Sequence, residues 1–189
     1  FILSLCGTAH LERARPFLEA GIPTYIDKPF ACTLADTLEI LELARRTGTT
    51  LIYGSALRFS AELQGLRDRQ TQLGGLRGLL AYGPGKRAES NPGLFHYGIH
   101  TVEMTYALMG PGCRHVSTVH TEETDVVTGA WDDGRTATLR VARTGSTAYG
   151  VVAWCNQGVA QTYVSTRYVY RNLCRRILKS FADKIPLVE

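Results

Sequence analysis

We find the clearest structural pattern in residues 22–53, IPTYIDKPFACTLADTLEILELARRTGTTLIY. The apolar runs at 22–26 and 50–53 predict two short strands. Between them, Thr33-Leu34-Ala35-Asp36 has the form of a capping box, and Gly48 is a stop signal, so the sequence predicts a helix. Its apolar residues at helical spacing are Leu34, Leu38, Leu41 and Ala44. A strand, a helix and a second strand in this order predict a right-handed βαβ unit with a parallel sheet.

The residues before this unit repeat the same pattern. Phe1-Ile2-Leu3-Ser4-Leu5 is an apolar run that predicts a strand buried on both faces. Thr8 is a possible cap for a helix to about Ala20, with Leu11, Ala14, Phe17 and Leu18 on one side and Gly21 after it. Pro16 predicts a late start or a kink in that helix.

The pattern changes after Arg58. Helices are expected up to Leu73, over 99–109 and over 168–182, with a final extension at Pro186. Residues 115–164 alternate between polar and apolar and carry turn signals, which predicts an antiparallel sheet. The predicted fold class is α/β: a partial Rossmann-type parallel βαβ sheet in residues 1–56, followed by an α+β domain with a large, mainly antiparallel sheet in residues 57–189.

Composition restricts the function classes. The net charge of +4 is spread out, and the one basic cluster, in residues 171–179, has the spacing of a solvated helix face, so nucleic-acid binding is disfavoured. The five cysteines are odd in number and form no Cys-x-x-Cys pair, which favours a reduced, cytoplasmic protein. No stretch approaches the roughly 20 apolar residues of a membrane span. The chain begins at Phe1 within an apolar run, so we expect the true N-terminus to lie elsewhere.

Lys28 is the first candidate for chemistry. Asp27-Lys28-Pro29 follows the predicted strand 22–26, and ligands of open α/β sheets bind at the carboxyl ends of the strands. Pro29 favours an extended backbone at Lys28. A lysine there can polarise a hydroxyl or carbonyl group. The alternative is a surface lysine before a turn proline, and the tripeptide alone favours that alternative.

His100 is the second candidate, in His96-Tyr97-Gly98-Ile99-His100 at the start of a predicted helix. Its ordinary pKa suits proton transfer near neutrality. A metal held by His96 and His100 is disfavoured, because there is no third ligand at a telling distance and Gly98 argues against a regular helix through both. A structural histidine is the alternative.

The order of these motifs resembles the Gfo/Idh/MocA oxidoreductases across nearly the whole chain. The stretch 20–31 with Asp27-Lys28-Pro29 is similar to the region of the family's Glu-Lys-Pro signature, with aspartate in place of glutamate. Cys6-Gly7-Thr8-Ala9-His10 resembles the family's cofactor loop and helix start. Two further stretches, Tyr53-Gly54 with Arg58-Phe59 and Gly98-Ile99-His100 with Leu108-Met109-Gly110, resemble the crossing into the second domain and the helix of the catalytic histidine.

The resemblance implies hydride transfer between NAD or NADP and a hydroxyl or carbonyl carbon of a sugar, polyol or similar small molecule. It implies that Lys28 and His100 are catalytic, and that Cys6, His10, Asp27 and Lys28 contact the cofactor. Substrate contacts are implied for Arg58, His96 and Tyr97. The partners expected are a small-molecule substrate and a second copy of the chain joined through the antiparallel sheet, with no nucleic acid, membrane or metal.

Two departures from the family pattern stand out. No Gly-x-Gly-x-x-Gly occurs in these residues, so we expect at least two βαβ units before Phe1 and no activity from the 189 residues alone. His96 stands where many relatives carry aspartate. These departures keep open a second hypothesis, a catalytically inactive binding or assembly module of the same fold. A third, a nucleic-acid binder, rests only on the pI near 8.9.

Overall fold

The computed structural model describes residues 1–185, so the expected extension at Pro186 lies outside the described residues. Contacts between residues divide the chain into two units. Unit one comprises Phe1–Ala56, Arg87–His96 and the chain from Tyr170, and unit two comprises Leu57–Lys86 and Tyr97–Val169. The division after residue 56 lies where the sequence pattern changes. The loop 87–96 and the last helix, however, are grouped with unit one, which the pattern did not indicate.

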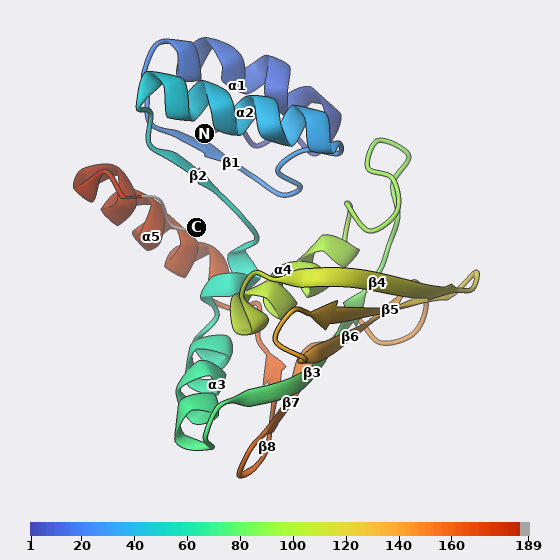
Figure 1. The fold of residues 1–189 in the computed structure, drawn as a ribbon. Coiled ribbons are helices and arrows are strands. Elements are labelled where there is room, and N and C mark those ends of the chain that lie inside the picture. Colours follow the sequence, from blue (N-terminus) through green and yellow to red (C-terminus); the bar gives the residue numbers. More distant parts are fainter. Residues whose placement is uncertain (186–189) are drawn as a thin grey trace. The chain divides into compact units, whose positions relative to one another are not determined.

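Unit one contains the parallel βαβ arrangement that the sequence predicts. Its elements are η1 (Gly7–Ala9), α1 (His10–Glu19), β1 (Thr24–Ile26), α2 (Leu34–Thr47), β2 (Leu51–Tyr53) and most of α5 (Val169–Asp183). β1 and β2 pair in parallel with Tyr25 opposite Ile52, and Ile2 adds a parallel bridge to Ile26. α1 and α2 lie side by side over one face of this small sheet (Figure 1).

The ends of α2 are set by the residues that predicted them. The hydroxyl of Thr33 accepts a hydrogen bond from the backbone nitrogen of Asp36 at 3.0 Å. Gly48 follows the helix in the left-handed region, with φ of 65°, which glycine adopts without a steric penalty. An N-cap of this kind stabilises a helix by about 1 kcal/mol. The predicted helix is therefore confirmed in its position and in both of its boundaries.

The start of α1 differs in part from the expectation. The helix begins at His10 after the 3-10 turn Gly7–Ala9, so it starts later than Thr8, and Thr8 makes no capping hydrogen bond. Pro16 lies inside the helix, and Gly21 follows it with φ of 70°. Because Pro16 lies inside the helix, the late start that it suggested did not occur.

The expectation of a first strand buried on both faces is wrong. Only Ile2 forms a bridge and is buried, whereas Phe1, Leu3 and Leu5 are 63%, 63% and 72% exposed. Side chains alternate between the two faces of an extended chain. In unit one the side chain of Ile2 joins the core with α1 and α2, whereas Phe1, Leu3 and Leu5 are not part of this core.

The buried face of α2 also differs from the predicted one. Ile40, Leu43 and Ala44 pack into the core, whereas Leu34, Leu38 and Leu41 are largely exposed. The helix carries apolar residues on two sides, and only one side faces α1 and the sheet. Spacing alone identified the helix but did not identify which side is buried. Phe17 of α1 is likewise 44% exposed, although Ala14 and Leu18 are buried as expected.

Unit two is built on a six-stranded sheet. Its helical elements are η2 (Ala56–Phe59), which begins at the unit boundary, α3 (Ala61–Gln72) and α4 (Gly98–Met109). Its strands are β3 (Leu76–Pro84), β4 (Cys113–His120), β5 (Thr124–Trp131), β6 (Thr136–Ala142), β7 (Tyr149–Cys155) and β8 (Gly158–Val164). The order is β4-β5-β6-β3-β7-β8, with every pair antiparallel except β3 and β6. The mainly antiparallel sheet is thus confirmed, with one parallel pair at its centre.

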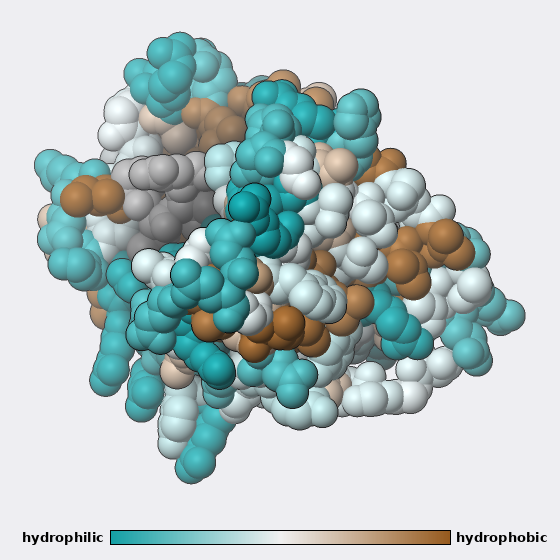
Figure 2. Space-filling model, turned by 60° about the horizontal axis from the view of Figure 1, so that its bottom comes forward, coloured by the Kyte–Doolittle hydropathy of each residue, from teal (hydrophilic) through white to brown (hydrophobic). Residues whose placement is uncertain are grey.

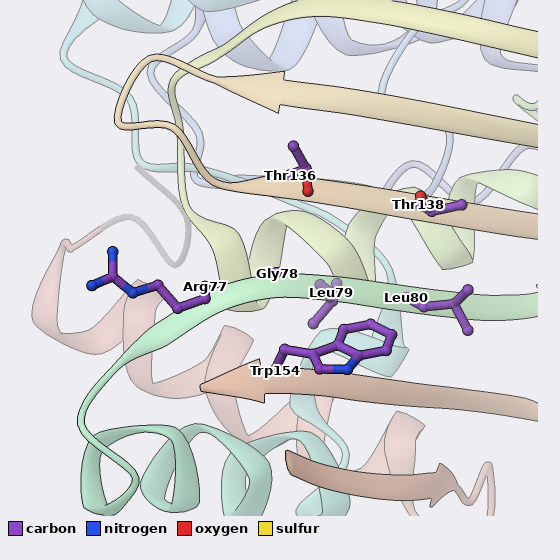
Figure 3. Close-up of a pocket in the computed structure, with 7 residues that line it drawn as sticks. All are labelled: Arg77, Gly78, Leu79, Leu80, Thr136, Thr138 and Trp154. Carbon is purple, nitrogen blue, oxygen red and sulfur yellow. The ribbon is translucent and has the colours of Figure 1, made fainter. Parts of the chain in front are cut away.

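The two faces of this sheet differ in what covers them. α3 and α4 pack against the sheet, and the alternate residues Leu79, Ala81 and Val141 are buried. Across β6, β3 and β7 there is a groove of about 300 Å³ beside Gly78, lined by Leu80, Thr136, Thr138 and Trp154 among others (Figure 3). The indole of Trp154 extends along β3 toward Leu80. Elsewhere, hydrophobic residues form separate patches among hydrophilic ones on the face that Figure 2 shows.

A buried ion pair between β5 and the residue that follows β6 leads to a stability prediction. Arg143 donates to Asp125 at 2.5 Å, and their side chains are only 13% and 5% exposed. Arg143→Ala removes the guanidinium from a buried carboxylate, so we expect it to lower the free energy of unfolding by about 3 kcal/mol. Urea unfolding followed by circular dichroism measures this loss.

The matched control is Arg114→Ala in the same sheet. Arg114 pairs with Asp132 at 3.1 Å, but these side chains are 67% and 49% exposed. An exposed pair is expected to contribute about 1 kcal/mol or less. Equal losses of unfolding free energy in the two variants would contradict the view that burial makes the Arg143–Asp125 pair the more stabilising one.

Candidate functional site

Asp27 and Lys28 lie directly after β1, at the carboxyl end of the parallel strands of unit one. The backbone nitrogen of Asp27 donates to the carbonyl of Ile2 at 3.0 Å, and the hydroxyl of Tyr25 donates to the Asp27 carboxylate at 2.8 Å. The Lys28–Pro29 peptide is cis. Asp27 is therefore held at the strand edge by both its backbone and its side chain.

Lys28 is half-buried and its ammonium group has a defined contact. Nζ donates to the backbone carbonyl of His96 at 3.4 Å, within unit one. Burial lowers the pKa of Lys28, and the negative charge of Asp27 opposes this effect in part. Desolvation disfavours the charged form of an amine, so this lysine releases its proton more readily than a surface lysine.

The turn around Gly7 connects the segment after Ile2 to α1. The Cys6 thiol lies 2.8 Å from the Thr8 hydroxyl, and hydrogen bonds from Thr8 lower the pKa of Cys6. A Cβ at Gly7 would come within 2.6 Å of Pro29 and 2.8 Å of Cys32. The turn thus packs directly against the segment that follows Lys28, and glycine is the residue that permits this approach.

His10 is fully buried, and its ring connects two backbone segments. Nδ1 lies 2.8 Å from the carbonyl of Pro29, and Nε2 lies 2.9 Å from the carbonyl of Ser4. The ring therefore connects the segment around Ser4 with the segment after Lys28. Its expected contact with a cofactor stays a prediction.

In unit two, His100 lies in the first turn of α4 between two tyrosines. Its ring centre is 5.9 Å from that of Tyr97 and 5.9 Å from that of Tyr149, both in edge-to-face geometry. Edge-to-face contacts of aromatic rings are favourable and restrict ring orientation. Gly83 of β3 makes room for Tyr149, because a Cβ there would overlap its ring and lie 2.7 Å from the hydroxyl of Thr101.

Arg58 forms an ion pair in unit two. Its guanidinium donates to the Glu103 carboxylate at 2.9 Å, and the two side chains are 17% and 16% exposed. Glu103 is three residues after His100 on α4. The pair ties η2 to the helix that carries His100, and a substrate contact by Arg58 stays a prediction.

The structure brings the candidate residues together in two groups. Cys6, His10, Asp27, Lys28 and His96 belong to unit one, and Arg58, Tyr97 and His100 belong to unit two. The expected meeting of Lys28 with His100 joins different units and stays a prediction. His96 lies before α4, so His96 and His100 do not share a helical face, as Gly98 indicated.

Two absences concern residues 1–185. No group of three or more potential metal ligands occurs among them. None of the helices described in this range is long and apolar enough to cross a membrane.

Sequence reasoning missed two residues of these groups, Asn91 and Tyr149. Asn91 is fully buried and contacts the Gly7 turn, and Tyr149 contacts His100. Asn91-Pro92-Gly93 has the composition of an ordinary turn, and Tyr149 is one aromatic residue of an alternating strand. Neither position carried a signal that the sequence alone would reveal.

Comparison with solved structures defines the class of fold. Over its whole length the chain superposes on 70% of GenD2 of gentamicin A biosynthesis, solved in complex with NAD, with a TM-score of 0.83 and 16% identity. Over 95% of its length it superposes on 68% of the UDP-N-acetylglucosamine 3-dehydrogenase GnnA of Acidithiobacillus ferrooxidans, with a TM-score of 0.76 and 18% identity. The chain therefore has the fold of the Gfo/Idh/MocA-type dehydrogenases, as the sequence resemblance implied.

A curated relative is similar in sequence as well. A protein of Amycolatopsis mediterranei, provisionally named as the oxidoreductase subunit of a UDP-kanosamine synthase, is 28% identical over 143 residues. The match covers 69% of this chain and 40% of the relative's length. No family model matches the chain.

Proposed function

We propose that this chain is the part of a Gfo/Idh/MocA-type oxidoreductase that carries the catalytic lysine and histidine. The main support is the half-buried ammonium of Lys28, which lies beside Asp27 at the carboxyl end of β1. The second support is the dehydrogenase fold of the chain. Ligands of open α/β sheets bind at that end of the strands. The proposed reaction is hydride transfer between NAD or NADP and a hydroxyl or carbonyl carbon.

The residues of unit one fit the nicotinamide end of such a cofactor. The Asp27 carboxylate is an acceptor for ribose hydroxyls, and the tight turn at Gly7 lies next to the segment that follows Lys28. Cys6 completes the set of groups that we assign to this end of the cofactor. We assign His10 to the same region because its ring nitrogens contact the carbonyls of Ser4 and Pro29. When bound, the nicotinamide supplies the hydride donor or acceptor.

The protein's own contribution is positioning and proton transfer. In the proposal, Lys28 hydrogen-bonds the reacting oxygen of the substrate, which stabilises the charge that develops there. His100 exchanges the proton of that oxygen, and its ring orientation is maintained by Tyr97 and Tyr149. Arg58, His96 and Tyr97 are proposed to contact the remainder of the substrate.

We propose a sugar, polyol or nucleotide sugar as the substrate class. Two of the similar proteins are named for UDP-linked sugars, and a third is the D-galactose-1-dehydrogenase of Rhizobium etli, which the chain matches with a TM-score of 0.78 at 14% identity. We also propose a cytoplasmic location, because all five cysteines are unpaired.

Cofactor binding by the full-length protein tests the proposal. Isothermal titration calorimetry with NAD(H) and NADP(H) is expected to give micromolar or tighter affinity for one pair. Absorbance at 340 nm is then followed with UDP-sugars, free sugars and polyols. Binding without turnover across this panel would favour the inactive module, and no binding of either cofactor would refute the oxidoreductase.

We further propose that two copies of the chain associate through the sheet of unit two. The supporting observation is the groove across β6, β3 and β7, beside which Trp154 is 45% exposed (Figure 3). Large, partly exposed aromatic residues are common at interfaces between proteins.

Trp154→Arg tests this association. A guanidinium in place of the indole would be buried without a partner in a dimer, so we expect sedimentation velocity to show monomers at concentrations where the wild type is dimeric. Tyr170→Arg, at a 65% exposed position of α5, is the control and is expected to leave the dimer intact. A monomeric wild type, or a dimeric Trp154→Arg variant, would contradict the proposal.

A further inference from the structure

Asn91 lies in the loop between β3 and α4, and its side-chain amide has several partners. It is fully buried, and its Oδ1 accepts from the backbone nitrogen of Gly7 at 2.9 Å and from the thiol of Cys32 at 3.5 Å. Its Nδ2 donates to the carbonyl of Leu5 at 2.5 Å and lies 3.5 Å from Nδ1 of His96. A side-chain amide offers two donors and two acceptors, so all of its capacity is used.

These contacts also fix the orientation of the amide. A backbone N–H such as that of Gly7 requires an oxygen, and a carbonyl such as that of Leu5 requires an N–H. Exchanging Oδ1 and Nδ2 of Asn91 would break both bonds, so only one orientation is consistent with the network. Nδ2 is therefore the donor toward His96, and Nδ1 of His96 is the acceptor. The proton of the neutral His96 ring then lies on Nε2.

The same loop contacts two of the residues that we assign to the nicotinamide site in unit one, Cys6 and Lys28. The carbonyl of Ser90 accepts from Cys6 at 3.5 Å, and the carbonyl of His96 accepts from Lys28 at 3.4 Å. Between them, Asn91 bonds the backbone on both sides of Cys6, at Leu5 and at Gly7. Loops usually run over the protein surface. This loop is instead anchored by the buried polar side chain of Asn91.

From this network we infer that Asn91 is a positioning residue of the proposed active site: it holds the Cys6–Gly7 turn in place and sets the tautomer of His96. The inference rests on the proposed function for its kinetic consequence. Its structural part, the tautomer of His96, is independent of any activity. Loss of the amide leaves the Gly7 nitrogen and the Leu5 carbonyl without their partner, so the turn is no longer restrained.

The test uses the full-length protein and the variants Asn91→Asp and Asn91→Ala. The aspartate keeps an acceptor for Gly7 but loses both donors and places a negative charge against the Leu5 carbonyl. We expect both variants to weaken NAD(H) or NADP(H) binding by roughly tenfold or more, measured by calorimetry. We expect kcat, measured at saturating cofactor, to change less than the KM for the cofactor.

Asn156→Ala is the matched control. The Asn156 amide also donates to a loop carbonyl, that of Gly74, but it lies at the β7–β8 turn of unit two. We expect it to lower stability without changing cofactor affinity. A similar loss of affinity in Asn156→Ala would overturn the inference, because it would reduce the role of Asn91 to general stability.

The tautomer of His96 gives a readout that needs no activity, and the wild-type measurement needs no variant. In the wild type, nitrogen-15 NMR of the neutral ring is expected to show a protonated Nε2 and an unprotonated Nδ1. In Asn91→Ala the two tautomers are expected to mix. A wild-type ring protonated on Nδ1 would overturn the inference. If the wild type binds neither cofactor, the proposed function fails, and the NMR result alone decides the role of Asn91.

Discussion

Lys28→Ala is expected to lower kcat by about 10³-fold while leaving cofactor affinity nearly unchanged. The ammonium acts on the reacting oxygen in the proposed mechanism, whereas the cofactor is held mainly by other groups. Initial rates at 340 nm give kcat, and calorimetry gives the dissociation constant of the cofactor. Normal turnover in this variant would count decisively against the catalytic role of Lys28.

Two further variants separate the charge of Lys28 from its position. Lys28→Arg keeps the charge but has a planar, longer head group, so it is expected to recover little activity. Lys179→Ala removes a 71% exposed lysine of α5 that pairs with Asp183, and it is expected to leave the rate unchanged. A rate loss in Lys179→Ala comparable to that of Lys28→Ala would show that the assay does not report on the site.

The lowered pKa of Lys28 also sets the direction of two pH effects. The charged form is lost at a lower pH than in an ordinary lysine, so kcat/KM is expected to fall with rising pH before an ordinary lysine would titrate. At a pH between the lowered pKa of Lys28 in the folded protein and its ordinary pKa in the unfolded chain, the unfolded chain binds more protons at this residue. The free energy of unfolding is therefore expected to rise with pH across this interval. Lys28→Met is expected to remove both dependences.

His100→Ala is expected to lower kcat by about 10²-fold to 10⁴-fold, because no group then exchanges the proton of the reacting oxygen. Free imidazole is expected to restore part of the rate. His115→Ala, at an exposed position of β4, is the matched control and is expected to retain full activity. Unchanged turnover in His100→Ala would exclude the proposed proton transfer.

The ring contacts of His100 predict a smaller, graded effect. Tyr149→Leu removes the edge-to-face contact and is expected to lower kcat by about tenfold, because a catalytic group displaced by a fraction of an ångström loses rate. Tyr149→Phe keeps the ring and is expected to stay close to the wild type. Equal rates for the leucine variant and the wild type would remove Tyr149 from the site.

Local signals predicted β1, α2 and β2 of unit one, although the strand expected over residues 1–5 is reduced to a bridge at Ile2. Thr33 and Gly48 define the ends of α2 through bonds and dihedral angles that depend only on neighbouring residues. The exposure of Leu34 and of Phe1 was not predictable in this way, because burial depends on which elements come to lie on each face. Local chemistry therefore gave the elements, and long-range packing selected their buried sides.

The same distinction applies to the candidate site. Lys28 and His100 were recognisable because their motifs and spacing resemble a known family. Asn91 was not, because its importance arises from contacts with Leu5 and Gly7, more than 80 residues away in the chain. The parallel pairing of β3 with β6 is equally non-local and has no signature in the sequence of either strand.

The division of the chain has a consequence for synthesis. Unit one is assembled from three separate stretches, and its last stretch begins at Tyr170. Residues 1–56 leave the ribosome long before the helix that supplies Phe181 beside Phe1, and before Asn91 can bond the Gly7 turn. The core of α1, α2 and the parallel strands can form from residues 1–56 alone, but α5 can join unit one only after nearly the whole of unit two has been translated.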